Sequence, residues 1–133
     1  MARRPSDAWR RRVEEEAAQL TGGALTPDQM YAAKLWPESL LNSTDAALTG
    51  FEDNLHTLTS PSDEDVFDTV KRLILALNQI NAQHGGAGYE TDEREELCHY
   101  IDASLSEYGI DVEALAARKN IGRWEITDTW RQW

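Results

Sequence analysis

Apolar residues recur every three or four positions along most of this chain, and that period predicts amphipathic α-helices. The clearest series are Trp9, Val13, Ala17 and Leu20; Leu48, Phe51, Leu55 and Leu58; Val66, Val70, Leu73, Leu77 and Ile80; and Leu97, Ile101, Leu105 and Tyr108. Ile74 and Leu75 widen the third series, which places that helix at the centre of a bundle. Residues 121–126 are the only weak candidate for a strand.

Capping and breaking residues set the expected bounds of the helices in the first half. Ser6 caps a helix that runs to about Leu20, and residues 26–29 start a short helix that ends before Pro37. Residues 37–43 then form a loop, and Ser43 or Thr44 caps a third helix.

Similar signals divide the second half. A helix follows Ser60-Pro61 and stops at Gly85-Gly86, and Thr91 caps the next helix, which stops at Gly109. Asp111 caps a short helix from Val112 to about Lys119, and Thr127-Asp128 starts a last turn. The fold class expected over residues 1–133 is all-α, a single-domain bundle of five to seven helices, with residues 1–5 as a flexible basic arm.

Charge alters this picture, because 24 acidic residues against 13 Lys and Arg give a net charge of −11. The acids dominate after residue 12, so the folded body repels phosphate backbones and nucleic-acid binding is excluded there. The early arginines, Arg10 to Arg12, precede Glu14 to Glu16 by four residues, which predicts ion pairs along one helix.

Cellular context follows from what the chain contains. One cysteine, Cys98, excludes an intramolecular disulfide, and we expect it to be a small core residue. The N-terminus lacks a secretory h-region, and no apolar run has the length of a membrane span. These features favour a cytoplasmic protein that does not bind membranes.

No reactive centre emerges from the residue types and spacings. The carboxylates cluster at helix starts, where they stabilise helices, and no pair shows the contrast in environment that acid–base catalysis needs. We therefore expect no enzyme activity, no cofactor and no metal. The alternative is a metal-dependent or small-molecule-binding helical protein that uses His84, Glu96, His99 and nearby carboxylates, since Glu96 and His99 have the spacing of a di-iron helix motif.

The preferred hypothesis is a non-enzymatic protein-binding module, immunity-type or regulatory, whose acidic surface attracts a basic protein. The glycine-rich loop before Thr91 is a helix stop and a new cap, or alternatively a partner-contacting loop anchored by Tyr89. The residues expected at the partner surface are Trp36, Glu52, Asp53, Asp63, Glu64, Asp65, Asp68, Tyr89, Glu90, Asp92 and Glu93. A structural homodimer whose exposed tryptophans pack across a two-fold axis is a further alternative.

Several segments carry a resemblance to known proteins. GGAGYETDEREELCHYIDASLSEYGID, the terminal ITDTWRQW and TGGALTPDQMYAAKLWP together resemble a family of small, acidic, uncharacterised actinobacterial proteins. A short acidic chain that ends in Trp-Arg-x-Trp also resembles immunity proteins that neutralise toxins. Neither resemblance implies a functional residue.

Overall fold

The computed structural model describes residues 2–133, and all of its regular secondary structure is helical. The elements are α1 (Pro5–Thr21), η1 (Pro27–Gln29), α2 (Ala32–Leu35), α3 (Glu38–Thr57), α4 (Asp63–Gln83), α5 (Thr91–Glu107), α6 (Val112–Arg118) and η2 (Arg123–Glu125). No strand occurs in residues 2–133, and the weak strand candidate at 121–126 contains the 3-10 turn η2 instead. The predicted all-α bundle is confirmed.

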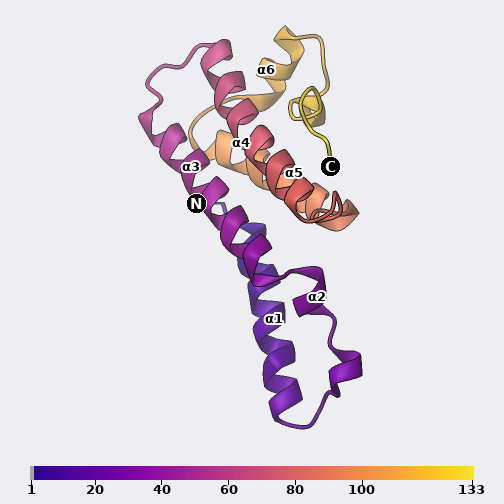
Figure 1. Ribbon diagram of the computed structural model, residues 1–133. Coiled ribbons are helices and arrows are strands. Elements are labelled where there is room, and N and C mark those ends of the chain that lie inside the picture. Colours follow the sequence, from indigo (N-terminus) through magenta and orange to yellow (C-terminus); the bar gives the residue numbers. More distant parts are fainter. Residues whose placement is uncertain (1) are drawn as a thin grey trace.

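The helices form a packet with one projecting end (Figure 1). Helices α3 and α4 pack together as a long pair, and α5, α6 and the C-terminal segment complete the packet. The α1–α2 hairpin, which we define as residues 5–35, extends away from it. The C-terminal segment is held against α4, because the Asn78 side chain donates to the Trp130 carbonyl at 2.7 Å and accepts from the Gln132 amide at 3.0 Å.

The core follows the predicted stripes. The third series is buried along α4, together with Ile74, so this helix is central as expected. Three residues of the predicted stripes are exposed instead: Ala17 of α1, Leu75 at 48% and Tyr108 at 36%. In α1, only Trp9 of its predicted stripe is fully buried, while Val13 and Leu20 are half-buried. Leu75 lies one residue, or about 100°, beyond the buried Ile74 and turns away from the core.

Helix α3 begins at Glu38, about six residues before the predicted cap, so the expected loop at 37–43 is wrong. Pro37 occupies the N-cap with an extended backbone, which is compatible with the helix that follows it. The polar residues after Leu41 favour a loop locally, but Leu40, Leu41 and Thr44 are buried. Tertiary burial therefore outweighs the local preference.

Two predicted caps are wrong by one or two residues, because the N-cap of α1 is Arg4 and not Ser6, and that of α5 is Glu90 and not Thr91. Several other helix ends match the sequence signals. Ser62 and Asp65 form a reciprocal capping box at the start of α4, and Asp111 caps α6 by accepting the Ala114 amide. Gly85, Gly86 and Gly109 all have positive φ, the conformation that ends helices and that glycine adopts without strain. Residues 26–29 contain the predicted capping motif but form only η1.

The N-terminal residues differ from the expected flexible arm. Pro5 is buried as the first residue of α1, and Arg4 is ion-paired with Glu52. Ser6 and Arg10 both contact Asp45 of α3, at 2.5 and 2.8 Å. These contacts, made by residues distant in sequence, hold the start of α1 against α3, while Met1 lies outside the described residues.

The predicted ion pairs within α1 do not form among the described residues. Arg10 pairs with Asp45, and the Arg12 guanidinium lies over the Trp36 ring at 5.1 Å. Glu16 accepts the backbone N–H groups of Tyr31 and Ala32 and so caps α2. Across residues 2–133, no helix has the length and apolar character needed to cross a membrane.

Candidate functional site

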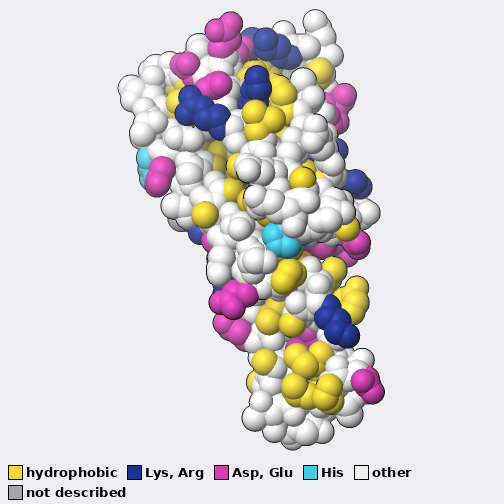
Figure 2. All heavy atoms as spheres, in the orientation of Figure 1, with side chains coloured by type: hydrophobic (Ala, Val, Ile, Leu, Met, Phe, Trp, Pro, Cys, Tyr) yellow, Lys and Arg dark blue, Asp and Glu magenta, His cyan; other side chains and the backbone are white. Residues whose placement is uncertain are grey.

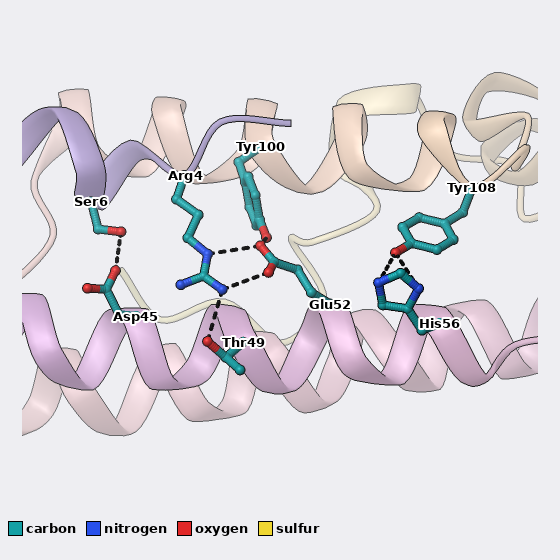
Figure 3. Close-up of polar contacts among 8 residues, drawn as sticks. All are labelled: Arg4, Ser6, Asp45, Thr49, Glu52, His56, Tyr100 and Tyr108. Atoms are coloured by element: carbon teal, nitrogen blue, oxygen red, sulfur yellow. Dashed lines mark hydrogen bonds and ion pairs between the residues drawn. The ribbon is translucent and has the colours of Figure 1, made fainter. Parts of the chain in front are cut away.

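A polar seam joins α1, α3 and α5 (Figure 3). Arg4 donates to both carboxylate oxygens of Glu52, at 3.0 and 2.6 Å, and to the Thr49 hydroxyl at 2.9 Å. The Tyr100 hydroxyl donates to the same carboxylate. The hydrogen bond from Arg4 lowers the pKa of Glu52 although burial opposes the shift, and burial followed by the Glu52 contact raises the pKa of Tyr100.

The charged groups of this seam, Arg4 and Glu52, are paired with each other. Glu52 was expected at the partner surface, but its carboxylate is largely covered and satisfied by Arg4 and Tyr100. A bidentate pair of this kind joins elements that are distant in the sequence. The seam therefore fixes the start of α1 on the packet, and both carboxylate oxygens of Glu52 accept hydrogen bonds within the chain.

The acids at the start of α4 are also engaged in the fold. Asp63 accepts two hydrogen bonds from Arg118, at 2.7 and 2.9 Å, and the Arg118 contact lowers the pKa of Asp63. Asp65 belongs to the capping box, and Asp68 pairs with Arg72 at 2.5 Å. Asp53 and Glu64, also expected at the partner surface, are exposed.

Both aromatic residues expected at the partner surface are buried, so their assignment is wrong. Trp36 stacks on Trp9 with ring centroids 5.9 Å apart, and the Tyr89 hydroxyl hydrogen-bonds the Thr44 hydroxyl at 2.6 Å. Burial raises the pKa of Tyr89 to about 12. The Asn81 side chain also accepts the Tyr89 amide at 2.9 Å, which holds the glycine-rich loop against α4.

A small acidic recess lies between α2 and the start of α5. Its volume is about 170 Å³, and its lining residues are Tyr31, Leu35, Glu90, Thr91, Asp92 and Glu93. Tyr31 is 59% exposed, whereas Glu93 is only 3% exposed. The Oε1 atom of Glu93 has no hydrogen-bond partner among the described residues. In the described part of the chain, it is the one buried carboxylate oxygen that lacks a hydrogen-bond partner.

The burial of Glu93 disfavours its charged form. Loss of solvent raises the pKa of Glu93, and the charges of Glu96 and Asp92 raise it further. The lining contains no Lys or Arg. A positively charged group placed in the recess would lower the electrostatic repulsion among its three acidic lining residues, Glu90, Asp92 and Glu93.

A wider groove runs along the other side of α5. Its volume is about 540 Å³, and its lining residues are Arg94, Glu95, Cys98, His99, Trp124, Asp128 and Arg131. Cys98 is half-buried at this groove rather than in the core, and its Sγ accepts from Arg131 Nη1 at 3.2 Å. The exposed His99 packs on Trp124 with ring centroids 4.7 Å apart. Arg131 also pairs with Asp128 at 3.0 Å, so two of the four charged side chains of the groove are paired with each other.

The alternative metal ligands do not converge. His84 contacts Ser39 and the Ile80 carbonyl, Glu96 accepts from Trp9 Nε1 at 2.7 Å, and His99 packs on Trp124. Within residues 2–133, no group of three or more His, Cys, Asp or Glu side chains is placed to hold a metal ion. The proposed set of His84, Glu96 and His99 is therefore wrong as a single site.

The expected acidic surface is divided into two parts. One group of acids begins α4 and the other begins α5, after α4 and the glycine-rich loop (Figure 1). A helix of 21 residues is about 30 Å long, so the two groups lie near opposite ends of α4. The structure does not bring them together at one binding surface.

Sequence reasoning overlooked the buried position of Glu93, although a signal was present. Glu93 precedes Leu97 and Ile101 by four and eight residues, so it continues their buried stripe. The recess itself also needs Tyr31, from a distant segment, and no spacing in the sequence indicates that contact. Comparison of the chain with known protein families, curated proteins and solved structures finds no match.

Proposed function

We propose that this chain is a protein-binding module whose partner places a basic side chain in the recess between α2 and α5. The observation that supports this function is the buried carboxylate of Glu93, with one oxygen unpartnered, beside Glu90 and Asp92. An unpaired buried acceptor destabilises a fold by roughly 1–3 kcal/mol. A lysine or arginine from a partner would offset the negative charge of this carboxylate and of its two acidic neighbours on binding.

The walls of the recess suit the stem of such a side chain. Tyr31 is largely exposed and supplies an aromatic face, and Leu35 supplies an aliphatic one. Lysine and arginine pack their methylene groups on apolar surface and interact favourably with aromatic faces through their charge. Tyrosine is also enriched among the residues that dominate binding energy at protein interfaces.

The net charge of the chain supports the same partner. A charge of −11 attracts a basic protein over long range and speeds its association. The recess then provides the short-range contact. In this proposal, binding is concentrated at the start of α5, whereas the acids that begin α4 contribute only to the general field.

A titration followed by amide NMR tests the recess directly. We expect Nα-acetyl-lysinamide or Nα-acetyl-argininamide to shift the amide signals of Tyr31, Leu35 and Thr91 saturably, while the uncharged Nα-acetyl-norleucinamide does not. Glu93→Gln should weaken binding by about fivefold or more, because it removes the charge that the ligand pairs with. The matched control is Glu95→Gln, which changes an exposed acid of the same helix and should alter binding less than about twofold.

Two outcomes would reject this proposal. One is a set of small shifts spread over all acidic segments, which indicates only non-specific attraction. The other is an equal loss of binding in Glu93→Gln and Glu95→Gln. Circular dichroism of each variant establishes that the fold is retained, so that a loss of binding reports on the recess.

A further inference from the structure

The outer face of α1 carries a row of exposed residues with an ordered charge pattern. The row, spaced by three and four residues, is Ala8, Arg11, Glu15, Ala18 and Gly22, and every member is exposed. Residues at this spacing lie on one side of a helix. The opposite side of α1, which includes Trp9 and Glu16, contacts the rest of the chain.

The two charged residues of this face, Arg11 and Glu15, have no ion-pair partner in residues 2–133, although they are four residues apart. In addition, the base Arg11 precedes the acid Glu15 along the helix. An isolated helix is more stable with the opposite order, in which acids lie near its start and bases near its end. Stabilisation of α1 itself therefore does not account for the pattern.

When two copies of this helix lie antiparallel, the positive residues of one copy face the negative residues of the other. Positive charges at Arg11 and Arg12 precede Val13, and negative charges at Glu14 and Glu15 follow it. We propose that two copies of this chain associate through antiparallel pairing of their α1 helices, with a two-fold axis near Val13. Arg11 of each copy then lies opposite Glu15 of the other, and Ala8 lies opposite Ala18, where small side chains allow the helices to approach closely.

Apolar surface lies near both ends of α1. Ala8 borders a groove of about 380 Å³ between α1 and α5, whose lining includes Ala2, Pro5 and Ala103. The outer end of the α1–α2 hairpin also carries hydrophobic side chains (Figure 2), of which Leu20, Leu25 and Met30 are partly exposed. In the antiparallel arrangement the outer end of one copy lies near the groove of the other.

The projection of the hairpin makes this arrangement accessible. Helix α1 extends away from the packet (Figure 1), and none of residues 10–31 is buried. A second copy therefore has free access along this face. Because a single helix pair is a small interface, we expect weak association, detectable at about 0.1–1 mM protein in low salt.

Charge reversal is the main test, with sedimentation equilibrium as the measurement. Arg11→Glu and Glu15→Arg each place like charges opposite one another and should weaken association by about tenfold or more. The double variant with both changes restores opposite charges across the axis and should recover the wild-type dissociation constant within about threefold. Association of the wild type should also weaken as salt is raised.

Cross-linking tests the antiparallel register independently. In a Cys98→Ser background, a chain carrying both Ala8→Cys and Ala18→Cys should form a covalent dimer on mild oxidation. Neither single-cysteine variant should do so efficiently, because like positions lie about 15 Å apart along the paired axes. Preferential cross-linking of Ala18→Cys alone would indicate another arrangement and would reject this one.

Three results would overturn the proposal. The first is a wild-type chain that remains monomeric up to about 1 mM in low salt. The second is association that is unaffected by either charge reversal, and the third is a double variant that stays as weak as the singles. The recess for a basic side chain lies on α2 and α5, whereas the proposed dimer contact lies on α1. A negative result in the NMR titration of the recess would therefore not affect the test of dimer formation.

Discussion

Glu52 and Glu93 show how the same residue type acquires opposite properties from its surroundings. Glu52 accepts from Arg4 and Tyr100, which stabilise its charged form. Glu93 is buried beside other acids with one oxygen unpartnered, which disfavours its charged form. Both were expected to serve as surface charges, and neither does so in the free chain.

Replacing each glutamate by glutamine should therefore change stability in opposite directions at pH 7. The folded-state pKa of Glu52 is lowered from 4.5, so its stabilisation is present above that value and is lost as pH falls through the folded-state pKa. We expect Glu52→Gln to reduce the free energy of unfolding by about 1 kcal/mol at pH 7 and by less near pH 3.

The folded-state pKa of Glu93 is raised from 4.5, so its charge destabilises the fold at pH 7 and has no such effect below that value. We expect Glu93→Gln to increase the free energy of unfolding by about 1 kcal/mol at pH 7, with the gain disappearing near pH 4. Urea denaturation at several pH values measures both variants. Effects of the same sign at pH 7 would contradict this account.

At the scale of the element, glycines mark the helix ends, but one glycine lies within a helix. Gly109 follows α5 with φ of 81°, whereas Gly50 lies on the exposed side of α3. A Cβ at either position would meet no atom within 4 Å. The two sites therefore differ in backbone conformation and not in packing.

The same substitution should consequently have opposite effects at these positions. Gly109→Ala should lower the free energy of unfolding by about 1 kcal/mol, because alanine resists a positive φ. Gly50→Ala should raise it by about 0.5–1 kcal/mol, because alanine is the better helix former. Thermal unfolding of the two variants provides the measurement, and destabilisation by Gly50→Ala would contradict the assigned helix.

At the scale of the whole molecule, burial is unevenly distributed between the packet and the hairpin. Helix α4 contributes a continuous buried stripe from Val66 to Ile80. The hairpin contributes Pro5, Ser6, Trp9 and Ala32, with no buried residue between positions 10 and 31. Its outer part is held mainly by contacts such as those of Glu16 with the start of α2.

Hydrogen exchange should therefore separate the two regions. Amides between Val13 and Leu35 should exchange through local opening at a lower free energy than those between Val66 and Ile80, since local stability follows buried contact. Mass spectrometry of deuterium uptake, at a protein concentration low enough to keep the chain monomeric, is the suitable measurement. Equal protection in both regions would show that the hairpin opens only with the whole fold.

Much of the architecture was determined by the sequence alone. Apolar periodicity identified α1, α3, α4 and α5, and the predicted cap Asp111 is the observed N-cap of α6. Glycines at positions 85, 86 and 109 identified the stops. These features were predictable because helix periodicity, capping and glycine conformations depend on neighbours within a few residues.

Tertiary structure decided the rest, because the remaining features depend on contacts between distant residues. Burial of Leu40 and Thr44 extended α3 into a segment whose local sequence favours a loop. Arg4 pairs with Glu52, and Glu16 caps α2, so these charged residues stabilise the fold. Their number and positions are evident from the sequence, which does not indicate these distant partners. The recess at Glu93 likewise exists only because α2 packs beside the start of α5, which no local pattern encodes.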